Sequence, residues 1–221
     1  MKLLIGALTK FIMGILMVGA LVFLPAWDIK FANGWLFMGL LFIPMLIVGV
    51  VMLIKSPALL KKRLDAKETQ NTQKGVVAFS GIIFIAGFVV AGLDHRFGWS
   101  RVPLWAVISA SVVLLVSYAL YAEVMRENAY LSRTIKVEEN QQIVNTGLYG
   151  IVRHPMYAAT IWLFLSIPVV LGSWWSLLCF FPYVGIIAVR IIGEEKLLDS
   201  ELVGYAEYKK KVKYRLIPFI W

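Results

Sequence analysis

The chain has 221 residues, of which 60% are hydrophobic and only 16% are charged. An ordinary soluble domain carries charge on about a quarter of its residues, so this composition excludes one. The formal net charge of +9 could suggest nucleic acid, but the basic residues follow a membrane topology, and we expect no nucleic-acid partner. The single cysteine, Cys179, lies in an apolar run, so no disulfide framework is expected.

Six apolar runs indicate membrane-spanning helices, each of which needs about 20 mostly apolar residues. We expect them at 3–26, 33–54, 75–93, 103–122, 157–172 and 174–192. The first run is too long for the hydrophobic part of a secretory signal peptide, so we expect it to be retained as a helix. The sequence therefore predicts an all-α fold, a polytopic membrane helix bundle with about six transmembrane helices.

The connections between the runs differ in character. The segment 55–74 combines six basic residues with a stripe of alanine and leucine, so part of it is expected to be an amphipathic interfacial helix. The connection 94–102 is charged, and we expect His95 in a loop there. The run 75–93 is rich in glycine, which lets neighbouring helices approach closely. Its glycines include Gly81, Gly87 and Gly92.

The distribution of basic residues predicts the orientation. With six spans both termini lie on one side of the membrane, and all but three of the 22 lysines and arginines fall on that side. The exceptions are Lys30, Arg96 and Arg101. By the positive-inside rule we expect both termini in the cytoplasm, with the basic surplus near anionic lipids. The expected location is the cell membrane of a prokaryote, with the functional site facing the cytoplasm.

The segment 145–157 is the most concentrated polar cluster beside an apolar run. It contains Arg153 and His154, followed by Pro155 and then Tyr157. Proline suits the first turn of a helix, so we expect the fifth span to begin at Pro155 with His154 near its N-cap. A helix N-terminus favours anions, so a carboxylate or phosphate could bind here. A plain capping turn with interfacial anchors is the alternative.

A second polar cluster follows the sixth span. Arg190 and Glu194 are spaced i, i+4 on one helix face, and Glu195 follows directly. The turn 172–175 is a tight hairpin, so this cluster and the segment 145–157 are expected side by side. Together they offer donors for an anion and carboxylates for a cation, which suits a zwitterionic ligand resembling an amino acid. A solvated ion pair at a helix end is the alternative, and no metal site is predicted.

Three motifs carry a family resemblance over roughly residues 120–221. They are Asn145-x-Gly147-x-Tyr149-x-x-x-Arg153-His154-Pro155-x-Tyr157, then Arg190-x-x-x-Glu194-Glu195, and last Tyr205-x-x-Tyr208-x-x-x-Val212 with Leu216-Ile217-Pro218. In combination they resemble the isoprenylcysteine carboxyl methyltransferase family and the related phospholipid methyltransferases. The resemblance implies N-terminal transmembrane helices over 1–102, with a structural or substrate-access role, and a methyltransferase core over 103–221. The cofactor pocket is then expected in the C-terminal half.

The resemblance also implies a cofactor and a set of site residues. The cofactor is S-adenosylmethionine, whose amino-acid part agrees with the zwitterion argument. The implied cofactor-binding residues are Gln142, Val144, Gly147, Leu148, Tyr149, His154, Tyr157 and Glu195. Arg190 and Glu194 are implied as catalytic residues where cofactor and lipid-like substrate meet, with Arg190 the better candidate for steering an acceptor carboxylate.

The acceptor is left open by these residues. The implied reaction is O-methylation of the carboxylate of an isoprenylcysteine-like substrate or of another isoprenyl or thiol-linked acid. N-methylation of a phospholipid amine is the alternative, in which a carboxylate such as Glu194 takes a proton. Two other classes also stay open, a nicotinamide-dependent membrane reductase and a non-enzymatic membrane protein. The sequence does not indicate an oligomeric state.

Overall fold

The computed structural model describes residues 2–64, 71–128, 130–131 and 141–221, and all regular elements in these ranges are helices. The long helices are α1 (Lys2–Ala26), α2 (Ala32–Lys55), α4 (Asn71–Phe97), α5 (Leu104–Glu127), α6 (Pro155–Val170) and α8 (Tyr183–Glu201). The short ones are α3 (Pro57–Leu64), the 3₁₀ helix η1 (Gly147–Gly150), α7 (Trp174–Phe180) and α9 (Tyr205–Lys211). The predicted all-α fold is confirmed.

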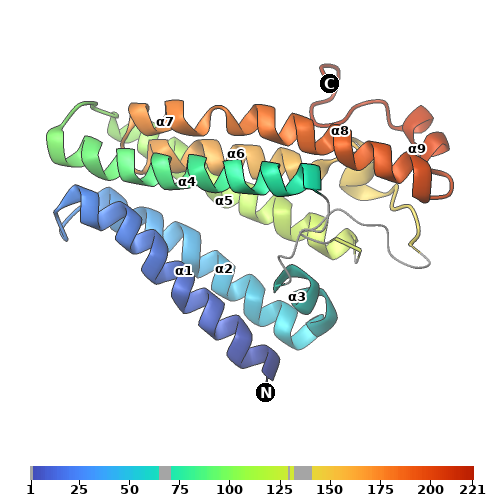
Figure 1. Ribbon diagram of the computed structural model, residues 1–221, viewed down its shortest axis with the longest axis horizontal. Helices are drawn as coiled ribbons and strands as arrows, with labels where there is room; N and C mark the ends of the chain where they lie inside the picture. The colour runs from blue at the N-terminus through green and yellow to red at the C-terminus, as the bar shows by residue number, and fades with distance from the viewer. Residues whose placement is uncertain (1, 65–70, 129, 132–140) are drawn as a thin grey trace.

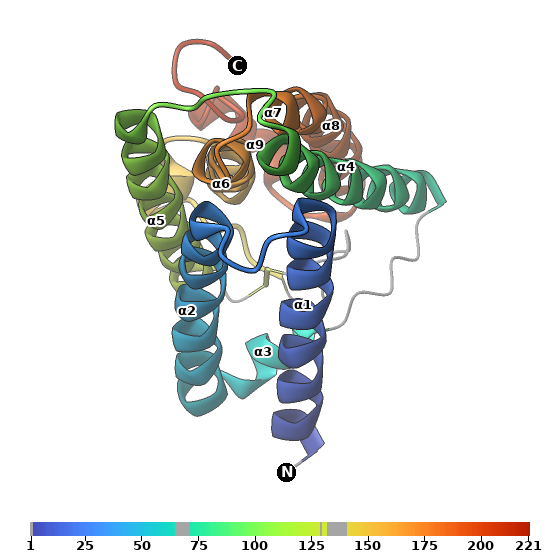
Figure 2. The same ribbon diagram turned by 90° about the vertical axis from the view of Figure 1, so that its left-hand side faces the viewer.

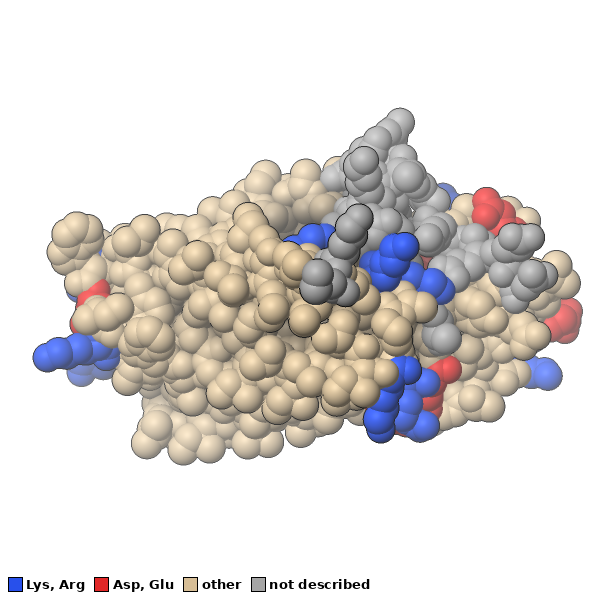
Figure 3. Space-filling model, turned by 90° about the horizontal axis from the view of Figure 1, so that it is seen from below, with Lys and Arg blue, Asp and Glu red and all other residues tan. Residues whose placement is uncertain are grey.

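Five segments of the described chain are long and apolar enough to cross a membrane. They are Leu3–Ala26, Ala32–Lys55, Gly75–Phe97, Leu104–Glu127 and Trp174–Glu201. In Figure 3 a broad part of the surface carries no charged side chains. Lysine and arginine side chains lie at the left end of the view and over its right half. The chain is therefore an integral membrane protein with a polytopic helical bundle, as the sequence predicts.

The fifth expected span, 157–172, corresponds to α6 and differs from the others in length. This apolar helix has 16 residues. At 1.5 Å per residue it is about 24 Å long, which is less than the roughly 30 Å of a hydrocarbon core. Its first residue is Pro155 and its N-cap is His154, as predicted.

The long helices run side by side along the molecule. In Figure 1, α4, α6, α7 and α8 run in similar directions, α5 slants away from them, and α1 and α2 cross below at an angle. Figure 2 shows the same pair on one side of the other helices. Pairwise packing joins α5 to α6, α1 to α4, and α4 to α7. Between them lies an apolar core whose fully buried members include Phe37, Leu114, Ile167 and Phe180.

Two local expectations meet the structure with different results. A helix does form within 55–74, namely α3, with Leu60 buried, whereas 65–70 lie outside the described residues. The expectation of a loop at His95 is wrong, because α4 continues to Phe97. His95 Nε2 lies 3.0 Å from Asp28 Oδ2. This contact ties the end of α4 to the α1–α2 connection.

The last expected span, 174–192, is interrupted. α7 ends at Phe180, and α8 begins at Tyr183. Pro182 lies between them, and its missing N–H cannot continue the helical hydrogen-bond ladder. The interruption lies in the middle of the candidate span Trp174–Glu201.

A buried carboxylate holds two connections together at the hairpin end of the bundle. Asp94 at the end of α4 is 1% exposed. It accepts hydrogen bonds from the Ser100 backbone N–H at 2.8 Å and from the hydroxyl groups of Ser100 and Ser173. Because Ser173 starts α7, the α4–α5 connection and the α6–α7 hairpin are fixed to each other.

Two of the glycines of α4, Gly87 and Gly92, allow close packing, as expected. A Cβ atom on Gly87 would lie 2.2 Å from Phe180 Cε2, and one on Gly92 would lie 2.5 Å from the Val22 carbonyl oxygen. A Cβ atom on Gly81 would meet nothing within 4 Å. Close contact therefore depends on Gly87 and Gly92.

Replacing Gly87 with alanine is expected to lower the stability of the bundle. The added methyl group overlaps the buried Phe180 ring, and overpacking of this kind costs about 1–3 kcal/mol. Gly81→Ala is the matched control, which we expect to be neutral or slightly stabilising because alanine favours helix. Thermal unfolding in detergent measures both. Equal melting temperatures for the two variants would contradict this packing.

Candidate active site

The hairpin between α6 and α7 brings the two predicted polar clusters together. Gly172 adopts a φ of +81° in the turn, which favours glycine. The Ser173 side chain then accepts the Ser176 N–H at 3.0 Å and caps α7. As a result, Arg153 before α6 contacts Glu195 on α8, with 2.7 Å between Arg153 Nε and Glu195 Oε1. The expected proximity of the two clusters is confirmed.

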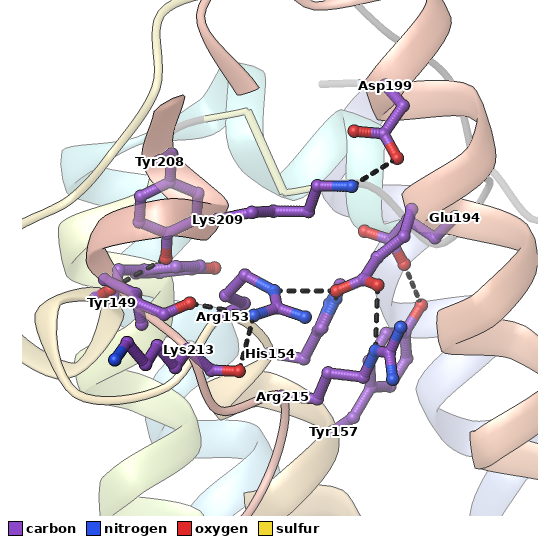
Figure 4. A network of polar contacts seen from close by, with 12 residues as sticks. Tyr149, Arg153, His154, Tyr157, Glu194, Asp199, Tyr208, Lys209, Lys213 and Arg215 are labelled. Carbon is purple, nitrogen blue, oxygen red and sulfur yellow. Dashed lines mark hydrogen bonds and ion pairs between the residues drawn. The ribbon is translucent and has the colours of Figure 1, made fainter. Parts of the chain in front are cut away.

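Glu195 is the centre of a buried ion-pair cluster (Figure 4). Its Oε1 accepts the hydrogen bond from Arg153 and lies 3.2 Å from His154 Nε2. Its Oε2 accepts a hydrogen bond from Arg215 Nε at 2.8 Å. The residue is only 4% exposed. Burying a carboxylate is costly in free energy unless its oxygens are paired, and here both oxygens are.

The C-terminal tail is bound to the start of α6 through the same residues. Arg153 Nη1 donates two hydrogen bonds of 2.8 Å to tail carbonyl groups, and the backbone N–H groups of Arg153 and His154 donate two more at 2.9 Å. The carbonyl groups belong to Val212, Lys213, Tyr214 and Arg215. The protein thus places one carboxylate of its own, that of Glu195, beside this helix start.

Tyr157 connects the two charged residues that are spaced i, i+4 on α8. Its hydroxyl donates to Glu194 Oε2 at 2.5 Å and accepts from Arg190 Nε at 3.0 Å. Figure 4 shows Tyr157 and Glu194 facing each other across the gap between α6 and α8. The side chains of Arg190 and Glu194 are therefore held at fixed positions beside the first turn of α6.

A 3₁₀ turn before α6 sets the position of Tyr149. Gly147 starts η1 with a φ of +53°, and a Cβ atom there would lie 1.5 Å from Glu127 Oε1. The Glu127 carboxylate accepts the Leu148 N–H at 3.1 Å. Tyr208 then donates its hydroxyl hydrogen to the Tyr149 carbonyl at 2.7 Å. Glycine is required at 147 both for the backbone angle and for this close carboxylate.

A cavity lies where these segments meet. Its polar lining consists of Asn128, Gln141, Gln142, Arg153, His154, Arg190 and Glu194. Its aromatic lining consists of Tyr130, Tyr149, Tyr157, Tyr205 and Tyr208. The remaining lining is aliphatic or thioether: Leu131, Ile143, Val144, Met156, Leu197, Leu198 and Leu202. Burial raises the pKa of the Tyr149, Tyr205 and Tyr208 hydroxyl groups, so they are protonated at neutral pH.

Most residues predicted for the site line this cavity. They are Gln142, Val144, Tyr149, His154, Tyr157, Arg190 and Glu194. Within the part of the chain that the structure describes, three predicted residues do not line it. Gly147 and Leu148 form the 3₁₀ turn behind Tyr149, and Glu195 lies in the buried cluster beside His154.

Sequence reasoning assigned no role to several residues that build the cavity. Tyr205 and Tyr208 were noticed only as part of the tail motif, although their i, i+3 spacing places them on one helix face. Nothing in the sequence distinguishes Arg215 from the other basic residues of the tail. Glu127 could have been identified, because an acidic residue at the C-terminal end of a helix interacts unfavourably with the helix dipole and so needs another reason to be there.

Removing the charge of Glu195 is expected to destabilise the protein strongly. Glu195→Gln leaves Arg153 and Arg215 without their carboxylate, and breaking a buried ion pair costs about 3 kcal/mol or more. Glu201→Gln, an exposed position on the same helix, is the control and should leave stability unchanged. The measurement is thermal unfolding in detergent. A melting temperature of Glu195→Gln equal to that of the control would refute the structural role of this cluster.

The comparison with protein families gives one match for this region. Residues 104–202 match the family described as phospholipid methyltransferase. The match runs from α5 through α8, so it includes the start of α6 and Arg190, Glu194 and Glu195, whereas α9 and the tail lie beyond it. Comparison with curated proteins gives no match. Residues 104–202 are therefore similar to the phospholipid methyltransferase family, a family of integral membrane methyltransferases.

Proposed function

We propose that this protein transfers a methyl group from S-adenosylmethionine to a small lipid-like acceptor in the membrane. One observation carries the proposal. The cavity brings His154 and Tyr157 of α6 next to Arg190 and Glu194 of α8, and all four residues lie in the region that matches the methyltransferase family.

The lining of the cavity fits this cofactor chemically. Arg153 and His154 offer donors for the carboxylate of its amino-acid part, and Glu194 offers an acceptor for its ammonium group. Gln142 and Tyr149 offer an amide and an aromatic face that suit its adenosine part, with Val144 beside them. In this proposal Gly147 and Leu148 support the adenosine side through their backbone.

The proposed role of Glu195 is that of a positioning residue. The structure buries it against Arg153 and His154, so it acts on a ligand by fixing these two side chains. Bound S-adenosylmethionine supplies a methyl group that is already activated on a sulfonium. The residues of the chain therefore contribute mainly orientation and exclusion of water.

For the acceptor we propose first a carboxylate, such as that of an isoprenylcysteine-like lipid. Arg190 lines the cavity and is held by Tyr157, so its guanidinium is placed to orient a carboxylate. Carboxylates are ionised at neutral pH and need no base before they attack. The reaction then requires Arg190 for placement and does not require proton removal.

A phospholipid amine is the second candidate acceptor, and two observations favour it. The matched family is described as phospholipid methyltransferase, and Glu194 lines the cavity as a carboxylate that accepts a hydrogen bond from Tyr157. An amine must lose a proton before it can accept a methyl group. Glu194 is placed to take that proton as a general base.

The proposed orientation places both termini and the cavity on the cytoplasmic side of a prokaryotic cell membrane. Support comes from the bias of lysine and arginine toward that side. In Figure 1, α3, α9 and the C-terminal tail lie toward the end opposite the α6–α7 hairpin. We propose that residues 1–102 give structural support or substrate access to the core over 103–221.

Binding of S-adenosylhomocysteine tests the cofactor assignment. We expect calorimetry in detergent to detect binding to the wild-type protein and no binding of NADPH. His154→Ala should weaken binding by about tenfold or more, since it removes a donor in the cavity. His95→Ala is the control, because His95 lies in the last turn of α4, and it should bind as wild type. Equal affinities for the two histidine variants, or no binding by wild type, would rule out this site.

The pH dependence of methyl transfer separates the two acceptors. A carboxylate acceptor predicts a rate that is nearly constant from about pH 6 to about pH 9, because it is ionised throughout. Arg190→Gln then raises the KM for the acceptor, while Glu194→Gln changes kcat little. An amine acceptor predicts a rate that rises with pH and a fall in kcat of about a hundredfold or more in Glu194→Gln. A radiolabelled methyl assay on extracted lipids and isoprenyl acids measures both quantities.

A further inference from the structure

Tyr205 carries a buried hydroxyl group that the fold does not use. The residue lines the cavity and is 4% exposed. Among the described residues, its hydroxyl oxygen is the one buried side-chain polar atom without a hydrogen-bond partner. Buried polar groups in folded proteins nearly always have partners, because an unsatisfied one destabilises the fold. This hydroxyl therefore calls for a partner that the chain itself does not provide.

Tyr208, on the same helix as Tyr205, has a hydroxyl group that is used within the fold. Tyr208 is one turn further along α9, with its ring centroid 5.8 Å from that of Tyr205. Its hydroxyl donates to the Tyr149 carbonyl at 2.7 Å. One tyrosine of the pair thus fixes α9 to the 3₁₀ turn. The other presents an equally buried hydroxyl that makes no such contact.

The ring of Tyr205 is held in place beside the charged cluster. It belongs to a buried cluster with Tyr208 and Val212, against which Ile143, Leu198 and Leu202 pack. Its charged neighbours are Glu195, Arg153 and Glu194, which affect its titration, while burial raises its pKa and keeps the hydroxyl protonated. Glu195 accepts hydrogen bonds from Arg153 and Arg215 and makes none with the Tyr205 hydroxyl.

We propose that the Tyr205 hydroxyl donates a hydrogen bond to the carboxylate of the methyl donor bound in this cavity. The assignment rests on the proposed function. It selects the carboxylate because Arg153, the donor we assign to the same group, lines the same cavity as Tyr205. Tyr205 lies beyond residues 104–202, so the binding site extends past the family-matched region into α9.

Two conservative variants test the assignment. Tyr205→Phe removes only the unpartnered hydroxyl, so we expect unchanged or higher thermal stability without ligand and an affinity for S-adenosylhomocysteine lower by about threefold to tenfold. Tyr208→Phe removes a hydroxyl that is bonded within the fold, so we expect a lower melting temperature without ligand. Calorimetry and thermal unfolding in detergent measure both effects on the full chain.

A truncated ligand locates the hydrogen bond. Methylthioadenosine lacks the amino-acid part, so Tyr205→Phe and wild type should bind it equally. Equal weakening with both ligands would place the partner on the nucleoside and overturn the carboxylate assignment. Unchanged affinity of Tyr205→Phe for S-adenosylhomocysteine, or a loss of stability like that of Tyr208→Phe, would overturn the ligand role of Tyr205 alone. Absence of binding by wild type would overturn the proposed function together with this assignment.

Discussion

The Glu195 carboxylate accepts hydrogen bonds from Arg153 and Arg215 and lies beside His154, so one buried charge joins three segments of the chain. These segments are α8, the start of α6 and the C-terminal tail. In a mostly apolar protein, such a charge is tolerated only when all its partners are present. The three segments therefore stabilise one another, and each depends on the other two for its position.

The cavity follows from this unit. Because Arg153 is fixed by Glu195 and by tail carbonyl groups, His154 and Tyr157 face α8 at a set distance. Tyr157 can then contact both Arg190 and Glu194. The tail also delivers α9, whose tyrosines close the cavity beside the 3₁₀ turn. Residues that hold the fold together and residues that line the cavity are thus direct neighbours, and Glu195 contacts two lining residues, Arg153 and His154, although it does not line the cavity itself.

Much of this architecture could be predicted from local sequence signals. Hydropathy located the helices, Pro155 located the start of α6, and the four-residue hairpin placed α6 beside α8. These signals work because each depends on neighbouring residues only. The break at Pro182 could also have been predicted from the sequence, since proline interrupts a helix. The continuous apolar character of 174–192 instead led to the prediction of one unbroken span. The short length of α6 was harder to predict, because the apolar run continues beyond the last residue of the helix.

The partners of Glu195 and the composition of the cavity wall could not be predicted in the same way. Arg215 reaches Glu195 through a tail without periodicity, so no pattern relates the two residues. For that reason Glu195 was assigned to the cofactor, whereas the structure gives it three partners within the chain. Likewise, the backbone of Gly147 and Leu148 was expected beside the adenosine part of the cofactor, and no local pattern indicated that Glu127 also lies against these two residues. Motif position indicates which residues matter, but the contacts decide how they act.

A double-mutant cycle between Arg215 and Glu195 tests most directly whether the cluster acts as a unit that shapes the cavity. The affinity for S-adenosylhomocysteine is measured by calorimetry for wild type, Arg215→Gln, Glu195→Gln and the double variant, at a temperature where all four are folded. The structure predicts that each single change weakens binding. The double variant should bind no more weakly than the single variant with the lower affinity, which corresponds to a coupling free energy between the two residues of about 1 kcal/mol or more. Additive losses would show that the two residues act independently and would contradict the account.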